Sequence, residues 1–144
     1  MLKICTSSML ICAVALLFIS CDGNNIKFDA NKSTITQENG ENLYRLTIAS
    51  DSVENFYLIE LKPGNTPKRQ ISLFEIDTNY IVTNWHGTLV KKITLLPNRI
   101  YTIENRSDGD CSPGYATFKT DSFGKPVPNI SKNQQILVKQ DSQR

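Results

Sequence analysis

Short runs of apolar residues, separated by turn residues, follow one another from Ile26 to Thr120. In several runs apolar and polar residues alternate, as they do along a half-buried strand. β-branched and aromatic residues fill the runs, and no stretch keeps a 3.6-residue apolar period over three helical turns. The pattern predicts an all-β domain of around seven or eight antiparallel strands. The runs are residues 26–28, 33–36, 43–48, 56–61, 71–76, 80–85, 89–96, 100–105 and 115–120.

Three runs carry a more specific expectation. Alternation places Tyr44, Leu46 and Ile48 on one face of their strand. The run "FYLIEL" at 56–61 is nearly all apolar, which is typical of a central strand covered on both faces. The apolar phase changes within residues 71–76, which indicates a bulge in that strand.

A different pattern occupies the N-terminus. Lys3 supplies one positive charge, "MLICAVALLFI" at 9–19 is apolar, and Ser20 precedes Cys21. The apolar run is shorter than the roughly 20 residues that cross a bilayer. A basic start, a short apolar core and a small residue before the cut are typical of a secretory signal, here residues 1–20. The alternative is an N-terminal membrane anchor that is not removed.

The residues "LFISC" at the end of this segment resemble the lipobox of bacterial lipoproteins, although Phe18 stands where Leu is usual. The resemblance implies that Cys21 is acylated (a palmitate-type lipid) and becomes the first residue of the mature chain. Acyl chains hold a soluble domain to a membrane by burial of their CH₂ groups. The implied location is the cell envelope, on the inner or outer membrane, facing the periplasm or the surface. Asp22 follows, which in enteric bacteria is associated with inner-membrane retention, and residues 21–25 form a polar tether.

Removal of the signal leaves roughly 124 of the 144 residues, the size of one ordinary domain. The expected β domain covers residues 26–128, followed by a polar tail over 129–144. Within the tail, "ILV" at 136–138 either adds an edge strand or frays. Lys and Arg number 16 and Asp and Glu 14, a balance that predicts no nucleic-acid partner.

The chain has four cysteines, of which Cys5 and Cys12 leave with the signal. If Cys21 carries lipid, Cys111 has no partner in its own chain and is a buried small hydrophobe or a free thiol. If Cys21 is not lipidated, a Cys21–Cys111 disulfide becomes the alternative.

The stretch "ITLLPNRIYTIEN" contains Leu95, Pro97 and Tyr101 in the order L-x-P-x-x-x-Y. This order resembles the corner between strands E and F of fibronectin type III domains, in which the tyrosine hydroxyl bonds back to the loop backbone. The resemblance implies an immunoglobulin-like β-sandwich with these three residues as its structural corner, and a final strand within residues 114–127. The tryptophan usual in strand B of that family is missing, because the only tryptophan is Trp85.

Residues that carry chemistry are few. The only histidine, His86, lies in the expected turn "NWHG", where an exposed or capping role is the simplest interpretation. A catalytic serine needs a base and zinc needs three or four ligands. Asp108 and Asp110 fit a solvated hairpin loop better than a calcium loop. The sequence therefore predicts no catalytic residue, no metal and no cofactor, and a Cys111–His86 pair is the one remaining nucleophile arrangement.

One loop suggests a contact surface. In "KPGNTPKR" at 62–69, three cations bracket two prolines, so a stiffened loop presents positive charge, with an ordinary basic turn as the alternative. An exposed tryptophan would add an aromatic contact. The candidate contact residues for a partner are Lys62, Lys68, Arg69 and Trp85.

These features favour a non-catalytic, lipid-anchored envelope protein whose β-sandwich binds a protein partner. A narrower alternative is an immunity lipoprotein that neutralises a toxin delivered to the periplasm, on a likeness of layout to some type VI secretion immunity proteins. A third class is a small envelope hydrolase, which requires Cys111 or His86 to meet acids in a pocket.

Overall fold

The computed structural model describes residues 23–39, 41–51, 55–107, 109 and 112–128. The expected signal peptide, Cys21, Cys111 and the "ILV" run at 136–138 lie outside these ranges. The described residues form no helix, so none of their elements is a helix that could cross a membrane. Every strand pair is antiparallel, which confirms the all-β prediction.

Nine short strands follow one another along the chain. They are β1 (Ile26–Asp29), β2 (Thr34–Gln37), β3 (Arg45–Ser50), β4 (Phe56–Leu61), β5 (Gln70–Ser72), β6 (Tyr80–Asn84), β7 (Ile100–Asn105), β8 (Gly114–Thr120) and β9 (Pro126–Val127).

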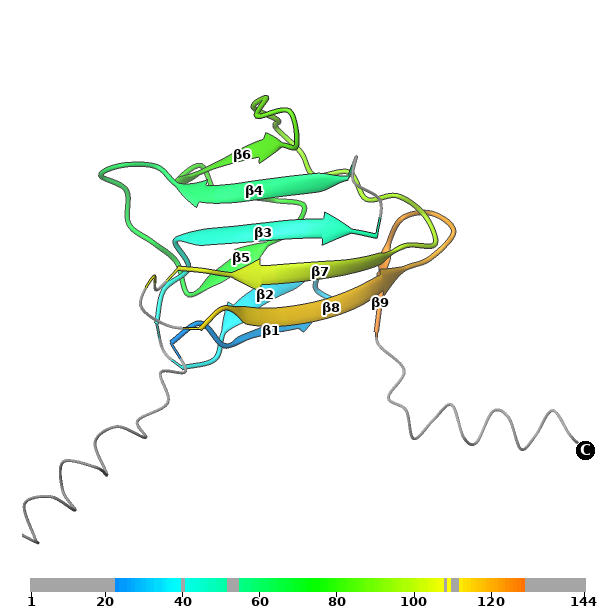
Figure 1. Cartoon of the computed structure of the whole chain (residues 1–144), viewed down its shortest axis with the longest axis horizontal. Coiled ribbons are helices and arrows are strands. Elements are labelled where there is room, and N and C mark those ends of the chain that lie inside the picture. The colour runs from blue at the N-terminus through cyan, green and yellow to red at the C-terminus, as the bar shows by residue number, and fades with distance from the viewer. Residues whose placement is uncertain (1–22, 40, 52–54, 108, 110–111, 129–144) are drawn as a thin grey trace, which may run out of the picture.

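The strands form two antiparallel sheets that share one hydrophobic core. The small sheet has the order β1-β2-β5 and the large sheet the order β6-β4-β3-β7-β8-β9. In the view of Figure 1 the small sheet lies behind the large one. The rings of Phe28 on β1 and Phe118 on β8 lie 4.4 Å apart and join the two sheets.

The core follows from the two-residue period of the strands. Inward positions of both sheets are buried, and each fully buried aliphatic side chain contributes about 1.5–3 kcal/mol. The most deeply buried large hydrophobic side chains are Ile35, Leu43, Leu46, Ile48, Ile59, Leu73, Ile93, Tyr101, Ile103 and Phe118.

The strands run between two ends of the domain, which Figure 1 shows at left and right. At the left, β1, β3, β6 and β8 begin and β4 and β7 end; we call this the N-terminal pole, with residues 23–25, 62–69, 105–107 and 112–114. The opposite end of the strands we call the hairpin pole. It comprises residues 92–98 and 121–125, at the right in Figure 1, and the turn 85–88 after β6, which lies at the top of the view. The 7 residues of β8 span about 20 Å, which sets the scale of the separation.

The strand expected over residues 71–76 ends early, because β5 stops at Ser72. The amide of Leu73 still donates to the carbonyl of Ser33 at 2.8 Å, but the amide of Glu75 donates to the Ser72 hydroxyl at 3.3 Å and the chain turns. The next strand, β6, belongs to the large sheet, so the chain must leave the small sheet at this point.

The strand expected over residues 89–96 does not form. Only an isolated bridge joins Leu89 to Thr83. The place beside β2, opposite β1, is taken by β5. Ile93 and Leu95 nevertheless point into the core and are buried. In residues 93–95 the alternation of apolar and polar residues therefore predicts burial correctly but strand pairing wrongly. Side chains of the large sheet bind the backbone of this segment in place of a neighbouring strand.

Two further strand expectations differ in detail. Leu46 and Ile48 share the buried face of β3, but Tyr44 is 45% exposed, because its amide turns to the Ser107 hydroxyl at 2.7 Å before β3 begins. β4 buries Tyr57 and Ile59, while its other face is half-buried. The described residues therefore cover β4 on one side only, and the expected cover on both faces is wrong.

Candidate binding surface

The sequence-predicted corner forms a buried polar cluster at the hairpin pole. The amide of Leu96 donates to the Tyr101 hydroxyl at 2.7 Å, and this hydroxyl donates to Oδ1 of Asn55. Burial raises the pKa of the Tyr101 hydroxyl, so it keeps its proton at neutral pH and serves as donor. The contact has the form that the fibronectin type III resemblance implies, a tyrosine hydroxyl on the loop backbone five residues upstream.

A second tyrosine holds the same segment. The Tyr57 hydroxyl donates to the carbonyl of Thr94 at 2.9 Å and lies 3.2 Å from its amide, and Nδ2 of Asn55 also donates to that carbonyl at 3.2 Å. Side chains thus replace the sheet partner that residues 93–96 lack.

Pro97 begins a turn in this segment, and Asn98 follows with φ of 55°. Proline followed by a residue with positive φ is the sequence of a type II turn. The Asn98 amide donates to the carbonyl of Asp121 at 2.9 Å, and the Thr120 hydroxyl donates to the carbonyl of Leu96 at 2.7 Å. The corner is therefore tied directly to the β8–β9 hairpin.

Replacement of Tyr101 by Phe is expected to lower the free energy of unfolding by about 2 kcal/mol, because the Leu96 amide and Asn55 lose their shared buried partner. Urea denaturation measures this change, with the midpoint lowered and the slope m of the unfolding free energy against urea unchanged. The matched control is Tyr115→Phe, whose exposed hydroxyl lies 3.4 Å from Glu104 and whose loss changes stability by less than about 0.5 kcal/mol. Equal stability of the two variants would contradict a structural role for the corner.

The β8–β9 hairpin presents an aromatic side chain to solvent. Phe123 at its tip is 84% exposed, the highest value among the large hydrophobic residues described. The Asp121 carboxylate fixes the turn by accepting from the amides of Phe123 at 2.8 Å and Lys125 at 2.9 Å. A turn fixed this way loses little backbone conformational entropy on binding.

Gly124 seats the hairpin on the corner. Its φ is +76°, and a Cβ added there would lie 2.5 Å from the Leu95 carbonyl oxygen. Only glycine permits both the backbone conformation and the close approach. The hairpin is therefore packed directly against the corner.

A shallow groove of about 300 Å³ lies between the hairpin and the corner segment. Phe74, Ile93, Leu95 and Phe123 form much of its apolar surface. Among the described residues that line the groove, two are lysines, Lys92 and Lys125, and none is acidic. We call this surface, with Phe123 at its edge, the hairpin groove.

Titration of Asp121 provides a direct test of this geometry. The two amide hydrogen bonds, first that of Lys125, hold the pKa of the carboxyl below its ordinary value of 3.8. Because the folded pKa is lowered, the turn's stabilisation is present at neutral pH and is lost as pH falls through that folded pKa. NMR of the carboxyl carbon is expected to show a midpoint below 3.8, and a midpoint at or above this value would exclude the turn.

The predicted basic loop lies at the opposite, N-terminal pole, and its charges make internal contacts. Nζ of Lys62 donates to the carbonyl of Thr78 at 2.6 Å, and Nζ of Lys68 lies 3.0 Å from the Asp77 carboxylate. The backbone amide of Asn79 and the Lys68 ammonium lower the pKa of Asp77.

Arg69 points to a different part of the same pole. Its guanidinium donates to the carbonyls of Gln37 at 3.1 Å and Glu38 at 3.3 Å, and so ties the β5 start to the end of β2. The structure therefore brings Lys62 and Lys68 to one turn but places Arg69 apart from them.

Trp85 lies in the turn after β6 at the hairpin pole, 47% exposed, so it is separated from the basic loop by the length of the sheet. Its ring lies 3.7 Å from the His86 ring, centroid to centroid. His86 is exposed in the turn that ends at Gly87, whose φ is 74°. No three His, Cys, Asp or Glu side chains gather into a possible metal site within the described ranges.

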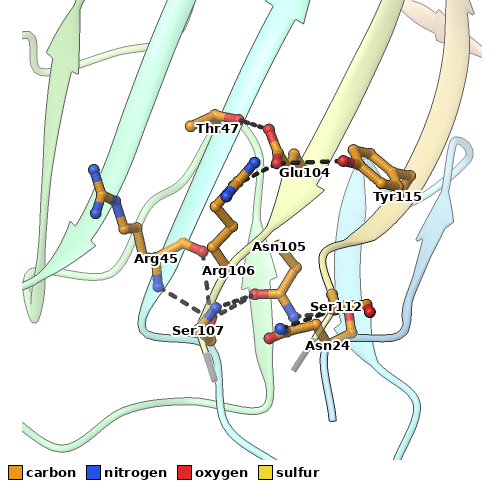
Figure 2. Close-up of polar contacts among 9 residues, drawn as sticks. All are labelled: Asn24, Arg45, Thr47, Glu104, Asn105, Arg106, Ser107, Ser112 and Tyr115. Atoms are coloured by element: carbon orange, nitrogen blue, oxygen red, sulfur yellow. Dashed lines mark hydrogen bonds and ion pairs between the residues drawn. The ribbon is translucent and has the colours of Figure 1, made fainter. Parts of the chain in front are cut away.

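The outer face of the large sheet carries cross-strand polar contacts, which Figure 2 shows. Glu104 on β7 accepts from the Thr47 hydroxyl of β3 and from the Tyr115 hydroxyl of β8, each at 3.4 Å. Arg106 also forms an ion pair with Glu104, so this carboxylate has three partners on the outer face.

Sequence reasoning did not identify the hairpin groove. The available signal was "DSFGK", in which Phe123 sits at the centre of a turn between Asp121 and Gly124. A large apolar residue at a turn tip has no core to enter, so this short stretch predicts an exposed aromatic side chain.

Comparison of the chain with known proteins gives no match among protein-family models, curated proteins or solved structures.

Proposed function

We propose that this protein is a non-catalytic, lipid-anchored protein of the bacterial cell envelope that binds a protein partner through the hairpin groove. The observation that carries the proposal is Phe123, an 84% exposed aromatic side chain on a turn fixed by Asp121 and seated on the corner by Gly124. Rigid, exposed aromatic residues are the usual anchors of protein interfaces.

The residues of the groove also indicate the surface chemistry of the partner. An apolar pocket on the partner would receive the Phe123 ring, and carboxylates around that pocket would face Lys92 and Lys125. Such charge pairs at an interface rim raise the association rate and fix orientation more than they add affinity. The partner surface is therefore apolar at its centre and acidic at its rim.

We further propose that the domain is an immunoglobulin-like β-sandwich of the fibronectin type III kind. Two antiparallel sheets around one core and the hydroxyl of Tyr101 on the Leu96 amide support this assignment. The departure is the third strand of the small sheet, which is β5 instead of the segment before Pro97.

The anchor rests on the signal-like N-terminus and the lipobox resemblance at Cys21. Expression in a bacterial envelope is expected to yield a chain that begins at Cys21, carries added acyl mass and partitions into detergent. Cys21→Ser is expected to abolish all three properties. Intact-mass analysis measures the result, and a water-soluble wild-type product without acyl mass would overturn this part of the proposal.

The partner is identified by photo-crosslinking from position 122 at the hairpin tip, in membranes that carry the acylated protein. A partner that is a secreted toxin would support the narrower form of the proposal, an immunity lipoprotein. A crosslinked partner whose binding does not depend on Phe123 would overturn the assignment of the groove.

A further inference from the structure

We infer that the domain has no flexible tether and that its N-terminal pole rests directly against the bilayer surface. The inference depends on the proposed acylation of Cys21. It goes beyond that proposal because it states which surface of the domain faces the membrane.

The chain is built into the fold as far back as Gly23. Nε2 of Gln37, a fully buried side chain, donates to the carbonyl of Gly23. The amide of Glu38 donates to the carbonyl of Asn25 at 2.9 Å. Residues 23–25, which the sequence predicted as part of a polar tether, therefore lie within the domain.

Asn24 adds two further attachments. It is 1% exposed, and its Nδ2 donates to the carbonyl of Ser112 at 3.1 Å, while Nδ2 of Asn105 donates to the Asn24 carbonyl at 3.0 Å. Figure 2 shows this arrangement of Asn24 between Asn105 and Ser112. A buried amide with satisfied hydrogen bonds is costly to pull out, because its polar groups would lose their partners.

The fit extends to the backbone of β8. A Cβ added at Gly114 would lie 1.7 Å from the carbonyl oxygen of Asn24, so glycine is what lets the two backbones meet. The N-terminal segment is thus a packed part of the N-terminal pole.

This attachment leaves little chain for a tether. Only Asp22 separates Cys21 from Gly23, and two residues reach at most about 7 Å. A domain whose strands run about 20 Å from pole to pole cannot turn freely on so short a connection. The acylated cysteine must therefore hold the N-terminal pole at the headgroups.

The surface that meets the headgroups has mixed charge. Three cations at or beside this pole are paired with carboxylates: Arg45 with Glu60, Lys68 with Asp77 and Arg106 with Glu104. Lys62 and Arg69 donate to backbone carbonyls and keep their positive charge. Because ion pairs offset most of the charge, attraction to anionic lipid is modest and the covalent anchor sets the orientation. The hairpin groove, at the other pole, then points away from the membrane toward its partner.

The test uses the full chain, expressed with its signal and carrying Cys111→Ser, so that an introduced cysteine is the only free thiol after acylation. Thr66→Cys labels the N-terminal pole and Ser122→Cys labels the hairpin pole; both positions are exposed. Each acylated protein receives a fluorophore and is reconstituted into phosphatidylcholine vesicles that contain a headgroup nitroxide lipid as quencher. We expect fluorescence to be lost at position 66 and retained at position 122.

The matched control inserts 12 Gly and Ser residues between Asp22 and Gly23, a flexible length of about 20 Å. We expect the difference between the two labels to disappear in this variant and to be unaffected by added salt in the original chain. Equal quenching of both labels in an acylated protein would overturn the inference alone. A product without acyl mass would overturn the proposed anchor, and the inference with it.

Discussion

Gly114→Ala is expected to destabilise the domain by about 3 kcal/mol. The added methyl would overlap the backbone of Asn24, and this overlap is relieved only if β8 or the N-terminal segment moves. The added methyl would lie 1.7 Å from the Asn24 carbonyl oxygen and 3.1 Å from Cα of Asn25. The β7–β8 pair contributes much of the large sheet, so the N-terminal segment is the part expected to yield.

Displacement of that segment has two measurable consequences. Urea denaturation is expected to show a lower midpoint, and hydrogen exchange is expected to show faster exchange at the Glu38 amide, which loses the carbonyl of Asn25. Gly109→Ala is the matched control, since a Cβ there meets no atom within 4 Å, and we expect a change below about 0.5 kcal/mol. Wild-type exchange at Glu38 in the Gly114 variant would show that the N-terminal segment is not packed as described.

Phe123→Ala is expected to weaken partner binding about 100-fold, or about 2.8 kcal/mol, while stability stays within about 0.5 kcal/mol of wild type. The ring is 84% exposed in the free domain, so its loss removes little from the core. In the complex it would fill a pocket, where an aromatic anchor contributes 2 kcal/mol or more on the usual scale of interface hot spots. Titration calorimetry with the purified crosslinked partner measures the affinity.

Two further variants make this measurement specific. Tyr115→Ala removes a 58% exposed ring from the outer face of the large sheet and is expected to leave affinity unchanged. Lys92→Glu with Lys125→Glu reverses both charges of the groove and is expected to slow association, an effect that grows at low salt. Unchanged affinity of the Phe123 variant would assign binding to another surface, and the Tyr115 variant then tests the outer face.

The L-x-P-x-x-x-Y segment shows how far a local resemblance can be carried. The likeness of Leu95, Pro97 and Tyr101 to a tyrosine corner implied a contact between the Tyr101 hydroxyl and the loop backbone, and the hydroxyl accepts from the Leu96 amide. The same motif did not reveal that the segment before Pro97 has no strand partner. Its partners are the side chains of Asn55 and Tyr57, about 40 residues earlier in the chain.

The loop that the sequence predicted as a contact surface shows what a local pattern does not reveal. Charge density in "KPGNTPKR" was visible in the sequence, but the ion pair of Lys68 with Asp77 and the bonds from Arg69 to Gln37 and Glu38 depend on which loops meet at one pole. A charge count along the chain cannot distinguish cations that face solvent from cations that hold neighbouring backbone.

The sequence by itself determined the all-β class and most strand positions, because a two-residue apolar period and turn residues are local properties of the chain. It also carries the whole argument for a lipid at Cys21, since that argument rests on consecutive residues. Only the tertiary structure decided that Asn24 belongs to the domain, that its backbone lies against Gly114, and that Phe123 lies beside a groove lined by two lysines. These features join residues roughly 30 to 90 positions apart, and long-range contacts of this kind are set by how the two sheets pack and not by any local pattern.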